Sequence, residues 1–168
     1  MSAAPGTPGL EIRFATPEDV PLVLSFIRGL AEYERLLPQV VATEEDVRES
    51  VFGARPGCEV LIATFDGRPA GFALFFHNYS TFLGRRGIYL EDLFVLPELR
   101  GKGIGKALLE RLAAIALERG CRRLEWAVLD WNTPAIDFYK KLGAVPQTEW
   151  TVFRVTGDAL KKLGRGQP

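Results

Sequence analysis

The sequence is poor in the residues from which metal sites and disulfide frameworks are built. Its 168 residues include a single histidine, His77, and two cysteines, Cys58 and Cys121. Two such cysteines form neither a framework nor a metal-binding spacing, so we expect partly buried free thiols in a reducing compartment. His77 lies in an apolar segment, where we expect a structural role, although any histidine-based triad would have to use it. We expect no bound metal.

Net charge is also lacking, because 21 basic residues balance 21 acidic ones. The composition therefore gives no reason to expect a nucleic acid or an anionic membrane as partner. No apolar run approaches the length of a membrane span, and the start "MSAAPGTPG" has neither the basic nor the apolar region of a signal peptide. We expect a cytoplasmic protein without a membrane partner.

The middle of the chain lacks the sequence features that separate one domain from another. It shows no internal repeat, linker or low-complexity segment, and 47% hydrophobic content fits a globular protein. We expect a disordered tail over residues 1–9, one domain over residues 10–163 and a frayed tail over residues 164–168.

Hydrophobic periodicity and turn signals predict a β-α-α-β-β-β-α-β-α-β order. Helices are expected to start at Thr16-Pro17, at Thr43 and at Asn132, and another follows the glycine-rich stretch as far as Arg119. The strands are expected at residues 10–15, 58–65, 70–79, 87–96, 122–129 and 149–155. The early hairpins should be antiparallel and the strand-helix-strand part parallel. We therefore expect an α/β protein of α+β type, with a mixed, mostly antiparallel central sheet and helices on both faces.

The segment "LRGKGIGKALLERL" has a glycine at every second position, Gly101, Gly103 and Gly105, between a strand and a helix. A helix N-terminus exposes unpaired N–H groups, and glycines let a phosphate approach them. The dinucleotide pattern fails because residue 106 is lysine, and the P-loop pattern fails at Arg100 and Ala107. An anion-binding loop and a tight turn without a ligand both remain open on this evidence.

Two segments carry a resemblance to a known family. "LEDLFVLPELRGKGIGKALLERL" and "WNTPAIDFYKKLGA" resemble the GNAT superfamily of acyl-CoA-dependent N-acetyltransferases, whose Q/R-x-x-G-x-G/A pattern matches Arg100, Gly103 and Gly105. The resemblance covers most of the chain, from "IRFATPEDV" to "EWTVF". "LAEYE" and "YLEDLFV" look most like the polyamine (spermidine/spermine) and thialysine acetyltransferases. It implies the GNAT fold, acetyl-CoA as co-substrate and a homodimer.

Amine acetylation requires a proton acceptor, because the neutral form of an amine with a pKa of about 10.4 costs roughly 4–5 kcal/mol at pH 7. Glu91 and Asp92 are candidates within the apolar segment "IYLEDLFVL". In a regular strand they point to opposite faces, so at least one meets the interior if both faces are covered. The alternative is a splayed or solvated strand end. The resemblance implies that Glu91 acts as base, often through water.

The resemblance also assigns the remaining chemistry. Tyr139, a core tyrosine on its pattern alone, becomes the general acid that protonates the departing thiolate. Asn132, otherwise an ordinary N-cap, contacts the pantetheine arm, and both roles are compatible. The coenzyme A contacts implied are Phe94, Val95, Leu96, Arg100, Gly101, Lys102, Gly103, Ile104, Gly105, Lys106, Asn132 and Ala135, with the backbone of residues 94–96 helping to polarise the acetyl carbonyl.

The acceptor pocket is implied by the polyamine resemblance, because carboxylates and aromatic rings attract ammonium groups. Its candidate residues are Tyr33, Glu34, Glu91, Asp92, Glu125, Trp126 and Glu149. On sequence alone each is a solvated charge or a core aromatic, and "PQTEW" is shorter than the usual version of that segment. We predict an acetyl-CoA-dependent N-acetyltransferase that acts on a small polyamine- or thialysine-like amine by direct attack in a ternary complex. The alternatives are acetylation of a protein amine or an antibiotic, and a non-catalytic acyl-CoA-binding module.

Overall fold

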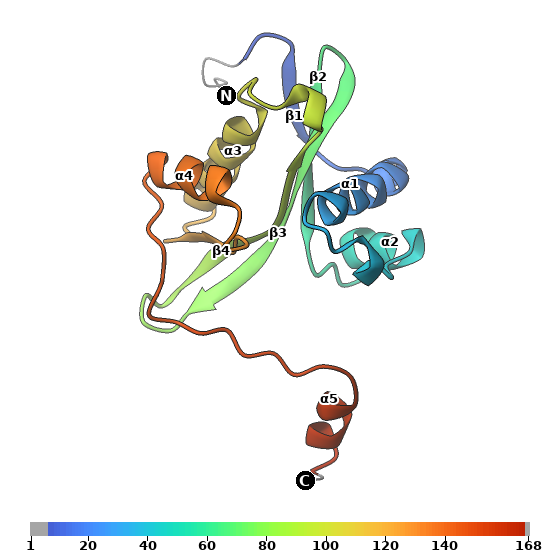
Figure 1. The fold of residues 1–168 in the computed structure, drawn as a ribbon, viewed down its shortest axis with the longest axis vertical. Helices are drawn as coiled ribbons and strands as arrows, with labels where there is room; N and C mark the ends of the chain where they lie inside the picture. The colour runs from blue at the N-terminus through green and yellow to red at the C-terminus, as the bar shows by residue number, and fades with distance from the viewer. Residues whose placement is uncertain (1–6, 167–168) are drawn as a thin grey trace. The chain divides into compact units, whose positions relative to one another are not determined.

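The computed structural model describes residues 7–166, and the outermost parts of the two predicted tails lie outside this range. Two compact units make up the chain, one ending at Leu129 and one beginning at Asp130. The elements of the first unit (Figure 1) are β1 (Leu10–Phe14), η1 (Pro17–Asp19), α1 (Val20–Tyr33), η2 (Leu37–Gln39), α2 (Glu44–Phe52), β2 (Glu59–Phe65), β3 (Arg68–Ser80), β4 (Arg85–Val95), η3 (Pro97–Leu99), α3 (Ile104–Glu118) and β5 (Leu124–Trp126). The second unit contains α4 (Thr133–Lys141) and α5 (Gly157–Gly164).

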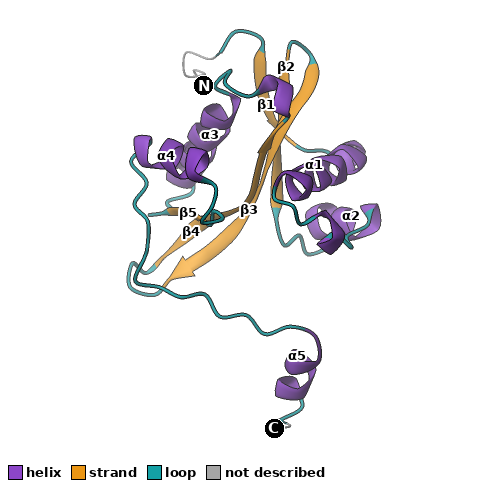
Figure 2. Ribbon diagram, in the orientation of Figure 1, coloured by secondary structure: helices purple, strands orange, loops and turns teal. Residues whose placement is uncertain are grey.

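The first unit is built on a five-stranded sheet in the order β1-β2-β3-β4-β5. Neighbouring strands are antiparallel except β4 and β5, which are parallel and are joined through α3. Figure 2 shows α1 and α2 over one face of the sheet and α3 over the other. The predicted mixed, mostly antiparallel sheet between helices is confirmed.

Local turn and cap chemistry explains several element boundaries. Asp66 and Gly67 join β2 to β3 and have φ values of 49° and 74°, the pair of positive values that a type I′ hairpin turn needs. At the start of α2, the Thr43 N–H donates to Asp46 Oδ2 at 2.8 Å and the Asp46 N–H donates to Thr43 Oγ1 at 3.2 Å. This capping box is the one that the sequence predicts.

The core on the α1 and α2 side of the sheet is aromatic. The rings of Phe26 and Phe72 stack with centroids 5.5 Å apart, and Phe94 lies 6.1 Å from Phe26. α1 approaches β4 closely at Gly29, where a Cβ atom would come within 2.8 Å of the Phe94 ring. Gly29 therefore allows the second half of α1 to pack directly onto the end of β4.

The strand predicted over residues 149–155 is wrong. Residue 149 lies in a turn and residues 150–155 belong to no strand, and Trp150 and Phe153 are 76% and 92% exposed. A strand needs a neighbour that takes up its backbone groups, and the described residues of the second unit contain no other strand. The strand predicted over residues 122–129 also shortens to β5, while α5 forms where the sequence pattern gave no helix.

Candidate active site

β4 has an open backbone edge over its second half. It pairs with β5 only from Ile88 to Leu90, whereas it pairs with β3 as far as Val95. Beyond Leu90, no described strand lies on the β5 side of β4. An extended ligand can add to such an edge as another strand would.

The three residues expected to contact pantetheine through their backbone are not equivalent at this edge. The Leu96 N–H is already used, because it donates to the Ala70 carbonyl at 2.9 Å on the β3 side. Successive residues of a strand direct their backbone groups to opposite edges, so Val95 faces the open edge while Phe94 faces β3. Of the three, Val95 is the residue whose backbone groups an edge-bound chain meets.

The glycine-rich loop follows this edge and leads into α3. Gly101 and Gly103 have φ values of 77° and 81°, in the left-handed region that favours glycine. Gly103 is the N-cap of α3 and supplies no side-chain cap, so the first N–H groups of a 15-residue helix have no side-chain acceptor from their N-cap. A Cβ atom built on Gly101 meets nothing within 4 Å. Gly103 is less open, since a Cβ atom there would lie 3.4 Å from Thr7 Oγ1. Open space beside Gly101, just before a helix N-terminus, is compatible with the phosphate groups of a coenzyme A molecule.

Cationic side chains border the loop. Arg100 Nε donates to the Val95 carbonyl at 3.1 Å, and its guanidinium carbon lies 4.5 Å from the centroid of the Tyr33 ring. Lys106 is exposed and pairs with Glu110 at 3.2 Å, and Lys102 Nζ lies 5.4 Å from the Phe65 ring. The loop therefore has positive charge beside its backbone N–H groups.

A β-bulge at Glu91 separates the two neighbouring carboxylates. Leu74 pairs with Asp92 and Phe75 pairs with Leu90, so Glu91 is an extra residue on β4. Glu91 is exposed, whereas Asp92 is half-buried opposite Leu74, which packs against the core under α1 and α2. The expectation that one of these two carboxylates meets the interior is confirmed, and that carboxylate is Asp92.

Electrostatic interactions connect Asp92 to other acidic groups on the same side of the sheet. Burial, together with the negative charges of Glu91 and Glu34, raises the pKa of Asp92 to about 6. Burial also raises the pKa of Glu34, which follows the last residue of α1. The pKa of Tyr89 is raised by burial and then by Glu91 and Glu125. Asp92 thus lies within electrostatic reach of Glu91 and Glu34, and Tyr89 lies within reach of Glu91 and Glu125.

Most of this negative charge is not neutralised within the protein. Among the described residues, no ion pair involves Glu34, Glu91 or Asp92. Glu125 differs, because its Oε2 pairs with Arg123 Nε and accepts from Asn78 Nδ2, each at 2.8 Å. A cationic ligand would therefore find unpaired carboxylates at Glu34, Glu91 and Asp92.

The structure brings most of the predicted acceptor residues of the first unit to one region. Tyr33 and Glu34 lie at the end of α1, while Glu91 and Asp92 lie on β4. Glu125 lies opposite Tyr89 on β5, whereas its neighbour Trp126, half-buried opposite Leu90, faces the other side of the sheet. Tyr89 is not among the predicted acceptor residues, although its position two residues before Glu91 on a predicted strand would have placed it near the same face.

Cys58, for which the sequence indicated no neighbours, lies within electrostatic reach of Asp92 and Glu59. Burial raises the pKa of its thiol, with further contributions from Asp92 and Glu59. Both cysteines are free thiols, as expected.

His77 belongs to a separate polar network on the α3 side. Its Nε2 lies 2.9 Å from Arg119 Nη1, its Nδ1 lies 3.0 Å from the Gly87 carbonyl, and Cys121 Sγ lies 3.8 Å from Nδ1. Arg119 also makes two contacts with Glu59, at 2.5 and 2.9 Å. These contacts join β2, β3 and the end of α3, which is what a structural histidine does.

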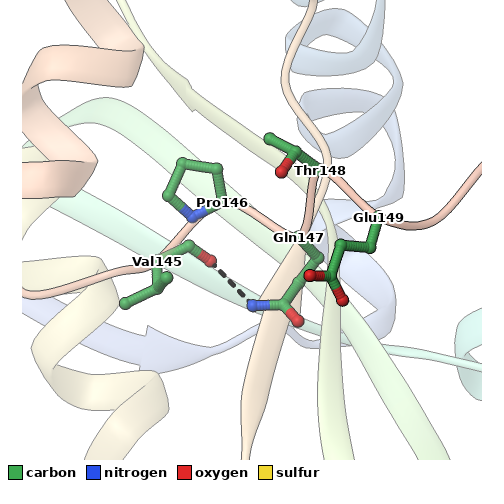
Figure 3. A pocket seen from close by; sticks show the side chains of 5 residues that line it. All are labelled: Val145, Pro146, Gln147, Thr148 and Glu149. Carbon is green, nitrogen blue, oxygen red and sulfur yellow. Dashed lines mark hydrogen bonds between the residues drawn. The ribbon is translucent and has the colours of Figure 1, made fainter.

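The second unit holds the remaining predicted residues. Asn132 caps α4, since its Oδ1 accepts from the Ala135 N–H at 3.4 Å, as the sequence predicts. Tyr139 is half-buried on α4, with its ring centroid 5.5 Å from that of Phe138. Glu149 lines the small pocket of Figure 3 together with Val145, Pro146, Gln147 and Thr148, where Gln147 Nε2 donates to the Val145 carbonyl at 3.1 Å.

Among residues 7–166, no group of three or more histidine, cysteine, aspartate or glutamate side chains is arranged to hold a metal ion. None of the described helices combines the length and apolar character needed to cross a membrane.

Comparison with known proteins shows extensive similarity. The thialysine N-epsilon-acetyltransferase of Bos taurus is 44% identical over 163 residues, which cover 90% of this chain and 95% of that protein. The L-ornithine N5-acetyltransferase of Arabidopsis thaliana is 34% identical, with 92% of this chain and 87% of that protein covered. The solved structure of an integron cassette protein from the mobile metagenome of Vibrio cholerae superposes with a TM-score of 0.79 at 30% identity, covering 94% of this chain and 98% of that one.

Residues 27–144 match the acetyltransferase (GNAT) family, and this range includes β4, the glycine-rich loop and α4. The match confirms the resemblance that "LRGKGIGKALLERL" and "WNTPAIDFYKKLGA" carry. It also confirms the fold expected from them and the N-acetyltransferase class. The chain therefore belongs to the GNAT family of acetyltransferases.

Proposed function

We propose that this chain transfers the acetyl group of acetyl-CoA to a primary amine of a small cationic acceptor, such as a thialysine-like amino acid or a polyamine. The observation that carries the proposal is the arrangement of β4. This one strand bears the acidic pair Glu91 and Asp92 and then continues as an open backbone edge into the glycine-rich loop. An amine and an acyl carrier bound at these two features would meet along the same strand.

The loop and the open edge fit coenzyme A in both shape and charge. The uncapped N-terminus of α3 and the nearby Arg100 suit the pyrophosphate, and the Val95 backbone suits the amide groups of the pantetheine arm. The predicted loop contacts from Gly101 to Lys106 all belong to this short stretch. The family resemblance adds Asn132 and Ala135, at the start of α4, to the predicted coenzyme A contacts.

The acidic residues can attract the cationic acceptor and remove a proton from its amine. Asp92 and Glu34 attract an ammonium group, and Glu91 takes a proton from it, directly or through water. The neutral nitrogen then forms a bond to the acetyl carbon, and the carbon–sulfur bond of the thioester breaks. Tyr139 donates a proton to the departing thiolate, so that the products are an N-acetylated amine and free coenzyme A. The nitrogen gives up its second proton to solvent, and Glu91 and Tyr139 return to their starting protonation states by exchange with solvent. The reaction requires no covalent acyl-enzyme and no metal.

The names of the relatives favour a small acceptor over a protein. Both the thialysine and the ornithine enzyme are named for the side-chain nitrogen of an amino acid. The unpaired carboxylates at Glu34, Glu91 and Asp92 suit an acceptor that carries more than one positive charge. A protein amine or an antibiotic as acceptor, and a module that binds acyl-CoA without catalysis, are the outcomes against which this proposal is tested.

The test is acetyl-CoA turnover, read as release of free thiol, with thialysine, L-ornithine, lysine, spermidine, putrescine and a lysine-containing peptide. We expect turnover with at least one small amine and a large fall in kcat for Tyr139→Phe and Glu91→Gln. Tyr79→Phe is the matched control, because Tyr79 is an exposed tyrosine outside the proposed site. Tight binding of acetyl-CoA without turnover on any amine would show that the chain is a binding module. Turnover with the peptide alone would show a protein acceptor.

The resemblance also implies a homodimer, and the sequence features above led us to expect a cytoplasmic location; both stay predictions. Sedimentation equilibrium of the purified chain measures the first.

A further inference from the structure

One side of α1 packs against the end of β4 and the residue that begins the glycine-rich loop. Gly29 and Tyr33 are one helical turn apart and therefore lie on the same side of α1. Gly29 meets the Phe94 ring, and the Tyr33 ring lies under the guanidinium of Arg100. Arg100 is 67 positions away from Tyr33 in the sequence, so this contact joins two distant parts of the chain.

The Arg100 side chain is held from two directions. Its Nε donates to the Val95 carbonyl at 3.1 Å on the open edge of β4, and its guanidinium carbon lies 4.5 Å from the Tyr33 ring centroid and 5.8 Å from that of Phe94. Among the described residues, no ion pair involves Arg100. Its positive charge is therefore balanced by no carboxylate, and it stands directly before Gly101.

Tyr33 is followed by Glu34, one of the carboxylates that raise the pKa of Asp92. The backbone at this end of α1 is closed tightly, since the Glu34 N–H donates to Leu30 and the Leu36 N–H donates to Ala31 at 2.7 Å. Arg35 between them has a φ of 62°, which a non-glycine residue adopts only when its surroundings require it. A change in the position of Tyr33 is therefore transmitted to Glu34.

We propose that Arg100 is a positioning residue that couples the two substrate sites through Tyr33. Bound acetyl-CoA fixes the Arg100 guanidinium beside its pyrophosphate, the fixed guanidinium holds the Tyr33 ring, and the end of α1 then holds Glu34 at the place where the amine binds. This inference rests on the proposed function, because it takes the loop as the coenzyme A site and Glu34 as part of the acceptor site.

The energy of the contact between Arg100 and Tyr33 sets the size of the coupling between the two binding events, and this coupling is reciprocal. An exposed cation–π contact is worth about 0.5–1 kcal/mol, which corresponds to a two- to fivefold change in affinity. Acetyl-CoA should therefore tighten amine binding by roughly two- to fivefold, and the amine should tighten coenzyme A binding by the same factor.

Isothermal titration calorimetry tests this with coenzyme A and thialysine as probes, or with whichever small amine the turnover panel identifies. The affinity for the amine is measured with and without saturating coenzyme A in the wild type, Tyr33→Ala, Tyr33→Phe, Arg100→Lys and the Tyr33→Ala/Arg100→Lys double variant. Tyr33→Phe keeps the aromatic ring, and Arg100→Lys keeps the charge but loses the planar group. Phe82→Ala, at a 97% exposed position, controls for removal of a surface aromatic.

We expect the coupling ratio to stay at two to five in the wild type, Tyr33→Phe and Phe82→Ala and to fall to about one in Tyr33→Ala. Coenzyme A alone should bind Tyr33→Ala within twofold of the wild type. The double variant should lose no more coupling than either single variant, because the same contact is removed.

Two results overturn the inference while the proposed function stands. These are a wild-type ratio of one in an enzyme that turns over, and a ratio that survives in Tyr33→Ala. If the wild type binds no coenzyme A, the proposed function fails, and this inference fails with it. Thermal unfolding of each variant separates loss of coupling from loss of fold.

Discussion

Asp92 lies opposite Leu74 on the face of the sheet that α1 and α2 cover, and this burial, with the charges of Glu91 and Glu34, raises its pKa to about 6. A buried carboxylate that no lysine or arginine neutralises costs free energy at neutral pH. The protein keeps it there beside Glu91 and Glu34, in the region where we propose that the amine binds. Because Asp92 is both half-buried and part of the proposed acceptor site, a measurement of protein stability also tests that site.

Asp92→Asn should increase the free energy of unfolding by about 1–2 kcal/mol at pH 7.5. The folded-state pKa of Asp92 lies above its ordinary value of 3.8, so the fold favours the protonated form. The wild type should therefore gain stability as the pH falls through about 6 towards 4, and the advantage of the variant should shrink over the same window. Urea denaturation at pH 7.5 and pH 4.5 measures both quantities. Asp137→Asn, at an exposed position, is the control, and a destabilised Asp92→Asn protein would show that the carboxylate has a stabilising partner.

The acceptor KM should rise as the pH falls below 6. Protonation of Asp92 removes a negative charge from the acceptor region, so the amine loses part of its electrostatic attraction, whereas the KM for acetyl-CoA should change little. Initial rates at pH 5.0–8.0 with each substrate varied in turn separate the two constants. In Asp92→Asn the acceptor KM should be raised at every pH and should lose this rise on the acidic side. Persistence of the rise in the variant would assign it to another group.

The local features of the fold follow from the sequence, whereas the features that depend on pairing with a distant segment of the chain do not. Asp66-Gly67, the Thr43 cap and the glycines before α3 are set by short-range chemistry, and they are where the sequence predicts them. Residues 149–155 alternate like a strand, but alternation specifies a strand only when another strand accepts its hydrogen bonds.

The candidate site shows the same division. Glu91 and Asp92 can be picked out from the sequence as charges in an apolar segment. Which of them is buried depends on the bulge at Glu91, and that bulge is set by the register of β4 with β3. The segment "YLEDLFV" contains no glycine or proline that would indicate a bulge. The contact between Arg100 and Tyr33 joins residues far apart in the sequence, so no local pattern indicates it.

Gly101→Ala should weaken acetyl-CoA binding by roughly five- to tenfold, about 1–1.4 kcal/mol. A Cβ atom at Gly101 meets nothing within 4 Å, so the cost arises from its φ of 77°, which the loop must relax and thereby displace its N–H groups. Gly84→Ala is the matched control, because Gly84 has a φ of 60° in equally open space on the β3–β4 turn. The control should lose stability by a similar amount and keep the affinity for coenzyme A. Equal affinity in both variants would argue against the loop as the phosphate site.

Asp19→Asn should decrease the free energy of unfolding by about 1–2 kcal/mol at pH 7. Asp19 is buried, accepts from Arg13 Nη1 at 2.6 Å and Nη2 at 2.9 Å, and accepts from the Thr16 N–H at 2.8 Å. The hydrogen bonds from Arg13 contribute most to lowering its pKa from 3.8 to about 2. Because the folded-state pKa is lowered, this stabilisation is complete above about pH 4 and is lost as the pH falls to about 2.

Asp46→Asn provides the comparison, since the exposed Thr43–Asp46 box has the same capping geometry without an arginine. Urea denaturation at pH 7 and pH 2.5 should show a larger loss for Asp19→Asn than for Asp46→Asn at pH 7, and a smaller difference between the two at pH 2.5. Equal losses at pH 7 would mean that the cap alone, and not the pairing with Arg13, stabilises the start of α1.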